Sequence, residues 1–284
     1  MTIVVTGATG SLGRLIIDHL LSRGTQPQQI VGVGRNTAKL AELDALGVST
    51  AVVDYADRAS LDAAFAGADT LMLVSGSEVG RRVEQHSNAI DAAKAAGISR
   101  IVYTSAPQAD TTALILAPEH KATEELLQAS GIPFTLLRNG WYTENYESTI
   151  AQARATGVYL ASSGDGRIAS ASRTDYAETA AIVLTSDGHE GAVYELSGDV
   201  AWDGDEMASA LSHVVGRDVV FSSVSPEEHV AALTGAGLDE QTAGFLVALD
   251  GNTRDGLLAT MTGDMKRLLG RPTTPLREGL AAIA

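Results

Sequence analysis

Three glycines at intervals of three residues, Gly7, Gly10 and Gly13, are the chain's most informative chemistry. They lie between an apolar run at residues 2–5 and a segment, residues 12–21, with apolar side chains at helical spacing. A turn between a buried strand and a helix needs glycine where a side chain would block a pyrophosphate or hold the helix off its strand. The first amides and the dipole of such a helix favour phosphate. We predict a dinucleotide site formed by Gly7, Thr9, Gly10, Ser11, Leu12 and Gly13; the alternative is a turn that needs glycine for geometry alone.

Arg35 bears on which nicotinamide cofactor is bound. It follows a second predicted strand at residues 30–33. An acidic residue about 20 positions beyond the glycines binds the ribose 2′-hydroxyl of NAD, whereas an arginine there accommodates the 2′-phosphate of NADP. We therefore predict NADP(H), the alternative being that Arg35 is an ordinary surface arginine.

Short β-branched runs alternate with amphipathic stretches through the first half of the chain. Further strands are predicted at residues 49–53, 70–74, 99–104 and 134–137. The helices predicted between strands are residues 37–46, 60–66, 79–96 and 119–130. Helices of this length permit right-handed crossovers between parallel strands. The alternation predicts an α/β fold with a doubly wound parallel sheet of the Rossmann type.

Residues that directly follow the strands are candidate site residues, because ligands of doubly wound sheets bind beyond the carboxyl ends of the strands. They are Asp54, Tyr55, Ser75, Gly76, Ser77, Ser105, Ala106, Asn139 and Gly140. We expect Asn139 and Gly140 to contact the cofactor near the nicotinamide. Trp141, Tyr142 and Tyr146 offer flat faces to an aromatic acceptor, although aromatic residues at this spacing also pack domain junctions.

The second half of the chain has a looser pattern. Predicted helices lie at residues 146–156, 175–186, 204–215, 226–234 and 239–249, and short strands at 193–196 and 219–222. The order Thr274, Pro275, Leu276 is typical of a helix start, and we expect that helix to reach the C-terminus. We predict an NADP-binding domain at residues 1–140 and a smaller helix-rich substrate lobe at 141–284, partly interleaved with it.

Composition excludes several classes of function. A net charge of −15 disfavours nucleic acid and anionic membrane surfaces as partners. The chain has no cysteine, its six histidines show no metal-ligand spacing, and it lacks a G-x-S-x-G elbow and a lysine-bearing P-loop. We predict no metal site. Met1 leads straight into the first strand and no apolar run approaches the ~20 residues of a membrane span, so we expect a cytoplasmic protein without membrane insertion.

Four segments together carry a family resemblance: T-G-A-T-G-S-L-G at 6–13, L-R-N-G-W-Y-T-E-N-Y at 137–146, G-D-G-R-I-A-S at 164–170 and R-T-D-Y at 173–176. In these segments the chain resembles atypical short-chain dehydrogenases/reductases of the NmrA-like group, and within it bacterial NADPH-dependent quinone oxidoreductases. The resemblance implies a Rossmann-type domain that holds NADPH, a small lobe and a cleft between them. It makes Trp141 a cofactor contact and Arg173 a cleft residue, for which an ion pair with Asp175 is the alternative. A homodimer is a possible assembly.

One departure from short-chain reductases concerns the catalytic acid. Their tyrosine and lysine, four residues apart, correspond to Ala117 and Lys121, and Ser105 stands at the position of their serine. The resemblance thus makes Lys121, Ser105 and Tyr142 the candidate catalytic residues while leaving the usual acid missing. The alternatives are a serine that closes a strand and a solvated lysine.

A quinone suits a site without that tyrosine. Hydride addition to a ketone creates an alkoxide about as basic as hydroxide, with a conjugate acid of roughly pKa 16, so an acid matters greatly. Addition to a quinone creates a phenolate-like anion, for which the tyrosine pKa of about 10 is the guide, and solvent can protonate it. We predict a two-electron NADPH:quinone oxidoreductase. Two alternatives stay open: a non-catalytic NADP(H)-sensing regulator, and a reductase or isomerase of another carbonyl substrate, whose acid would be His120, Tyr142 or Tyr146; we expect His120 to be exposed.

Overall fold

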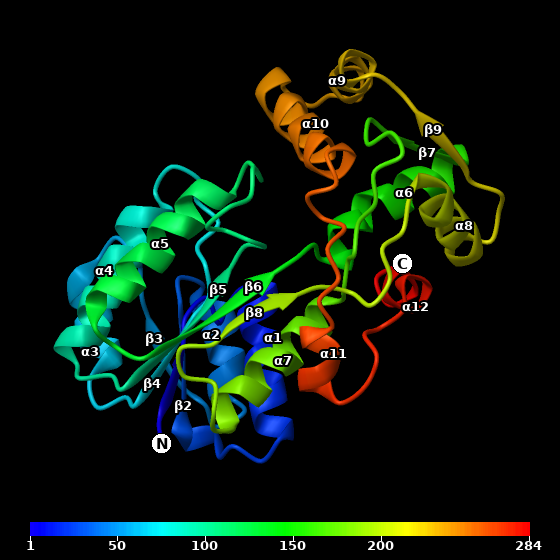
Figure 1. The fold of residues 1–284 in the computed structure, drawn as a ribbon. Helices are drawn as coiled ribbons and strands as arrows, with labels where there is room; N and C mark the ends of the chain where they lie inside the picture. Colours follow the sequence, from blue (N-terminus) through cyan, green and yellow to red (C-terminus); the bar gives the residue numbers. More distant parts are fainter.

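A seven-stranded parallel sheet forms the centre of the protein in the computed structural model, which describes residues 1–284 (Figure 1). The strand order is β3-β2-β1-β4-β5-β6-β8. The strands are β1 Ile3–Val5, β2 Ile30–Gly34, β3 Ser49–Val52, β4 Thr70–Leu73, β5 Arg100–Ser105, β6 Phe134–Asn139 and β8 Val193–Leu196. The predicted doubly wound parallel sheet is confirmed. Its order reverses between β1 and β4, where such sheets bind their ligands.

Helices cover both faces of the sheet. On one face lie α3 Arg58–Phe65, α4 Arg82–Ala95 and α5 Ala117–Ser130. On the other lie α1 Ser11–Ser22, α2 Thr37–Asp44, α7 Arg173–Thr185 and α11 Asp264–Leu269. Each face buries its own apolar cluster, centred on Ile16 and Ile17 of α1 on one side and on Phe65 of α3 on the other. The central strands β1, β4, β5 and β6 are buried from both faces, which explains their largely apolar sequences, whereas the edge strand β3 is partly exposed.

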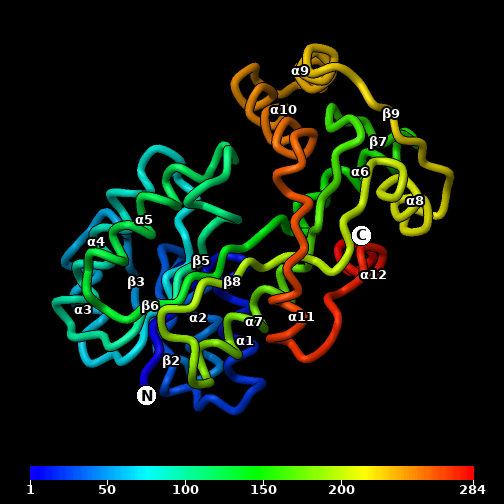
Figure 2. The backbone as a smooth tube through the Cα atoms, viewed as in Figure 1, coloured from blue at the N-terminus to red at the C-terminus, as the bar shows by residue number.

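A smaller lobe stands beside the carboxyl edge of the sheet (Figure 2). It contains α6 Glu147–Thr156, α8 Gly204–Val215, α9 Pro226–Gly235, α10 Glu240–Arg254 and α12 Leu276–Ala281, with β7 Val158–Ala161 and β9 Val220–Ser223 paired in parallel. Between visits to this lobe the chain returns to the main sheet to supply α7, β8 and α11. The division into domains at residue 140 stays a prediction.

The second half of the chain differs from the prediction in three ways. The strand β7 and the helix α11 were not predicted, and the last helix ends at Ala281 instead of the C-terminus. The strand β7 starts directly after Gly157, the left-handed residue that ends α6, so no turn segment marks it. The helix α11 has only six residues between Gly263 and Gly270, too few to show a helical period. No helix has the length and apolar character needed to cross a membrane.

Candidate active site

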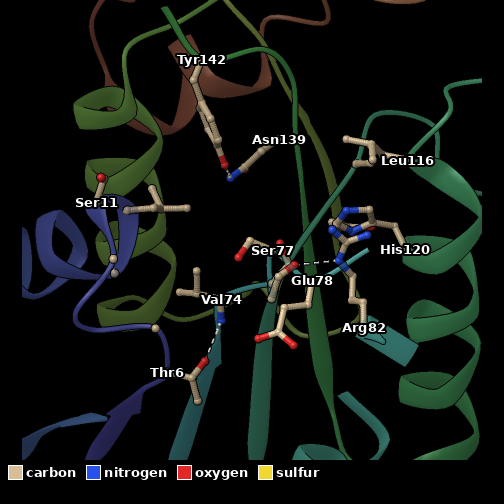
Figure 3. A pocket seen from close by; sticks show the side chains of 18 of the residues that line it. Thr6, Ser11, Val74, Ser77, Glu78, Arg82, Leu116, His120, Asn139 and Tyr142 are labelled. Atoms are coloured by element: carbon tan, nitrogen blue, oxygen red, sulfur yellow. Dashed lines mark hydrogen bonds between the residues drawn. The ribbon is translucent and has the colours of Figure 1, made fainter. Parts of the chain in front are cut away.

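A cavity of about 610 Å³ runs along the carboxyl edge of the sheet and continues under the lobe. Its walls include nearly every candidate residue predicted from the sequence. They are Gly7, Thr9, Gly10, Ser11, Leu12, Gly13, Arg35, Asp54, Tyr55, Ser75, Gly76, Ser77, Ser105, Asn139, Gly140, Trp141, Tyr142 and Arg173. The fold therefore gathers these separate strand ends around one space, part of which is shown in Figure 3. Two candidates do not line the cavity: Lys121, which is exposed on α5, and Tyr146.

The glycine turn at one end of the cavity leaves room for a diphosphate. A Cβ on Gly13 would lie 2.3 Å from the carbonyl oxygen of Gly7, and Gly7 itself has φ +61°. The helix α1 begins at Ser11 and has Gly10 as its N-cap, without a side chain that accepts from its first amides. Those amides are free to bind an anion. The turn thus fits the phosphates of a dinucleotide.

The side chain of Arg35, directly after β2, forms an ion pair. Its Nη1 donates to Glu78 Oε1 at 2.7 Å, across the mouth of the cavity. Hydrogen bonds from Arg35 and Gln85 lower the pKa of Glu78, which keeps this carboxylate ionised at neutral pH. Glu78 was missed by the sequence reasoning because it lies beyond the residues that directly follow β4 and before α4. A 2′-phosphate bound by Arg35 would have to displace this carboxylate.

Glu78→Gln is therefore expected to strengthen NADPH binding while leaving NADH binding unchanged. The substitution frees Arg35 and removes a negative charge that would face the phosphate. Because the ion pair is largely exposed, the gain should be modest, about two- to fivefold in Kd. Fluorescence titration of both cofactors measures it, and Glu84→Gln, on the exposed side of α4, is the control. Weaker NADPH binding in Glu78→Gln would show that the carboxylate positions Arg35 instead of competing for it.

The other end of the cavity is built around Tyr142. Asn139 Nδ2 donates to the Tyr142 hydroxyl at 3.1 Å, and Arg173 Cζ lies 5.2 Å from the centroid of the Tyr142 ring. Burial raises the pKa of Tyr142, so its hydroxyl stays protonated at neutral pH. Asn139 Oδ1 is buried without a hydrogen-bond partner, which leaves an acceptor for a donor such as the carboxamide of a nicotinamide.

Two alternatives from the sequence are decided by the geometry around Arg173 and Tyr146. Asp175 pairs with Arg271 at 2.9 Å, whereas Arg173 donates to Asn145 Oδ1. An ion pair between Arg173 and Asp175 is therefore the wrong explanation for Arg173. Tyr146 packs edge-on against Trp202 in the lobe core and does not line the cavity.

Ser105 lies at the end of β5 with its hydroxyl committed to a buried partner. Its Oγ donates to Glu124 Oε1 at 2.5 Å, and Glu124 forms a two-pronged pair with Arg138 at 3.0 and 2.7 Å. Arg138 also contacts Asp110 and Glu195. The hydrogen of the Ser105 hydroxyl is already used in its bond to Glu124. The hydroxyl oxygen can therefore accept a hydrogen bond from a ligand but cannot donate one to it.

His120 corrects the expectation for α5. It was expected to be exposed, but it is 6% exposed and lines the cavity, while Lys121 points to solvent. Successive residues of a helix are about 100° apart around its axis, so neighbours face different surroundings. The buried residues Ala117, His120 and Leu127 share one face of α5. That spacing was visible in the sequence and could have identified His120.

A second cluster of Ser162, His229 and Asp250 resembles a hydrolytic triad in composition only. The Ser162 hydroxyl and the Asp250 carboxylate both approach the same atom, His229 Nδ1, each at 3.1 Å. A triad needs the serine and the carboxylate on opposite ring nitrogens. The cluster instead ties α9 and α10 to the end of β7, which supports α10 where Leu249 and Asn252 line the cavity.

A doubly wound sheet with a glycine turn at its first crossover and a cavity along its carboxyl edge defines a dinucleotide-binding protein. Residues 7–187 match the NAD(P)H-binding family, and the chain belongs to this family. Over 281 residues it is 45% identical to Quinone oxidoreductase 2 of Escherichia coli (strain K12), covering 99% of this chain and 98% of that protein. The resemblance found in the sequence is confirmed.

Solved structures agree over the full length. The crystal structure of the Escherichia coli NADPH-dependent quinone oxidoreductase QOR2 complexed with NADPH matches with a TM-score of 0.95 at 44% identity, covering 99% of each chain. The triphenylmethane reductase of Citrobacter sp., complexed with NADP(H), matches with a TM-score of 0.95 at 36% identity, covering 100% of each chain. The fold is thus that of enzymes whose structures hold NADPH or NADP(H).

Proposed function

We propose that this protein is an NADPH-dependent oxidoreductase that transfers a hydride to a quinone-type acceptor. The observation that carries the proposal is the composition of its single large cavity. One part has the glycine turn and Arg35, which suit a phosphorylated dinucleotide, and the other has flat and apolar walls from Leu114, Leu116, Trp141, Leu249 and Leu258. Full-length similarity to a quinone oxidoreductase at 45% identity supports the same function.

The residues around the reacting centre suit an acceptor that needs no strong acid. Ala117, at the position of the usual tyrosine, is 2% exposed and has no proton to give. NADPH supplies the hydride when bound, and the chain's task is to hold a flat acceptor against it and exclude water. Tyr142 and Trp141 offer ring faces for this purpose. Cytoplasmic location and a homodimeric state stay predictions of the sequence.

Purified protein is expected to oxidise NADPH in the presence of benzoquinone- and naphthoquinone-type acceptors, with one NADPH consumed per quinone. That ratio follows from a two-electron transfer. Absorbance of NADPH under anaerobic conditions measures it, with reactions lacking protein or acceptor as controls. Triphenylmethane dyes are tested as a second class of acceptor, because the relative with 36% identity is named a triphenylmethane reductase.

The outcomes separate the alternatives. Saturable NADPH binding without turnover of any acceptor would favour the sensor function. Turnover of dyes but not of quinones would keep the oxidoreductase and change the acceptor class.

A further inference from the structure

The cavity wall formed by α4 and α5 carries two polar groups that the proposed function has not used. His120 of α5 and Arg82 of α4 both line the cavity and are almost completely buried. Figure 3 shows them on one wall, with Asn139 and Tyr142 across the space. What they can do depends on which of their N–H groups are free.

The tautomer of His120 follows from its contact with Tyr103. The Tyr103 hydroxyl is fully buried and its hydrogen-bond partner is His120 Nδ1, at 2.8 Å. Burial raises the pKa of Tyr103, so the hydroxyl keeps its proton and needs an acceptor. His120 Nδ1 supplies it. A neutral imidazole that accepts at Nδ1 carries its proton on Nε2.

His120 Nδ1 is the partner in hydrogen-bond geometry for the Tyr103 hydroxyl, and Thr123, the other polar side chain beside it, is already engaged. The Gly76 amide donates to His86 Nε2 at 3.0 Å, so His86 carries its proton on Nδ1 and donates to Thr123 Oγ1, also at 3.0 Å. The Thr123 hydroxyl donates in turn to the carbonyl oxygen of Glu119 at 2.9 Å. With the Tyr103 proton assigned to His120 Nδ1, the Nε2–H of His120 is left without a protein partner.

Arg82 adds a fixed positive charge beside His120. Its Nε donates to the carbonyl oxygen of Gly76 at 2.8 Å and its Nη1 to Glu119 Oε2 at 2.7 Å. Its Nη2 has no hydrogen-bond partner in the protein and is accessible to solvent. Because Arg82 lines the cavity, Nη2 is open to it. The same holds for Nε2 of His120. Two N–H donors thus face the cavity with no acceptor from the chain.

We propose that His120 Nε2–H and Arg82 Nη2 together bind the acceptor oxygen on which negative charge develops during hydride transfer. This inference rests on the proposed function and names the residues that replace the missing tyrosine. The quinone accepts a hydride, with its two electrons, from the bound cofactor and becomes a hydroquinone monoanion. Water then protonates that anion, and neither His120 nor Arg82 gives up a proton.

His120 acts here as a neutral donor, not as an acid. Burial and the nearby Arg82 lower its pKa to about 3. The titratable and charged groups around it are Arg82 and His86 of α4, Tyr103 of β5, and Glu119 and Glu124 of α5. A neutral imidazole can polarise an oxygen without transferring its proton. The hydride-transfer rate should therefore show no inflection near pH 6.5, the ordinary histidine pKa.

The experiment compares His120→Leu, which removes the donor, with His120→Gln, which keeps an N–H. Stopped-flow single turnovers measure hydride transfer and fluorescence titration measures NADPH binding. We expect His120→Leu to transfer hydride about 100-fold more slowly, with its NADPH Kd unchanged, and His120→Gln to recover much of the rate. The loss should be larger for alkylated quinones, whose reduced anions are more basic, than for halogenated ones. Glu125→Gln, on the exposed side of α5, is the control.

Several results would overturn the binding of the acceptor oxygen at His120. They are a full rate in His120→Leu, a loss of equal size for both kinds of quinone, and a wild-type rate that titrates near pH 6.5. Nitrogen NMR of His120 in the wild-type protein tests the tautomer without any acceptor, and a proton on Nδ1 would overturn the inference. Wild-type protein that reduces no quinone would contradict the proposed function alone, and the NMR result would still decide the state of His120.

Discussion

Gly13→Ala is expected to weaken NADPH binding by about 100-fold, the upper range for forcing a side chain into a closed site. The new Cβ would lie 2.3 Å from the carbonyl oxygen and 2.6 Å from the carbonyl carbon of Gly7. Both are backbone atoms of the turn, so relief requires α1 to move away from β1. That movement displaces the free amides at the start of the helix. Calorimetric titration with NADPH measures the effect, and thermal unfolding reports the cost to the fold.

Gly244→Ala is the matched control for Gly13→Ala. Gly244 lies within α10, and a Cβ there would meet nothing within 4 Å. Alanine stabilises a helix relative to glycine, by up to about 1 kcal/mol. The control should therefore gain stability and bind NADPH normally. If Gly13→Ala bound NADPH as tightly as Gly244→Ala, the turn would not be the diphosphate cradle.

The sequence was sufficient for features encoded by neighbouring residues. Buried strands read as short apolar runs, so the class of the sheet and the residues at its carboxyl edge followed from the strands and their ends. The glycine turn was equally local, since Gly7, Gly10 and Gly13 lie between one strand and one helix. Most of the candidate residues found in this way lie around the cavity.

Contacts made across the fold were beyond that reasoning. Glu78 meets Arg35 only because the segment after β4 folds over the end of β2, 43 positions away. Arg82 faces the cavity because Glu119, on a different helix, holds its guanidinium. Whether His120 or Lys121 faces the cavity depends on the rotation of α5 about its own axis. Alignment to the tyrosine and lysine of other reductases selected Lys121, which is the exposed residue of the two.

Arg35→Ala is expected to weaken NADPH binding by about 10- to 100-fold, the range for charged hydrogen bonds, and to leave NADH binding unchanged. Arg35 directly follows β2, where the 2′-phosphate of NADP lies in Rossmann folds with an arginine at this position. NADH carries a hydroxyl in place of that phosphate, so the loss should be confined to NADPH. The ratio of the two dissociation constants is therefore the quantity to measure, by fluorescence titration at constant ionic strength.

The control and the second variant make the assignment of Arg35 specific. Arg58→Ala removes an arginine that pairs with Asp62 on α3 and does not line the cavity, so it changes the net charge equally without touching the site. Equal losses for NADPH and NADH in Arg35→Ala would show that Arg35 does not recognise the 2′-phosphate.

In the double variant Arg35→Ala/Glu78→Gln, the gain expected from Glu78→Gln should shrink, because part of it comes from freeing Arg35. A gain of undiminished size would instead mean that Glu78 acts on the phosphate directly, by charge repulsion alone.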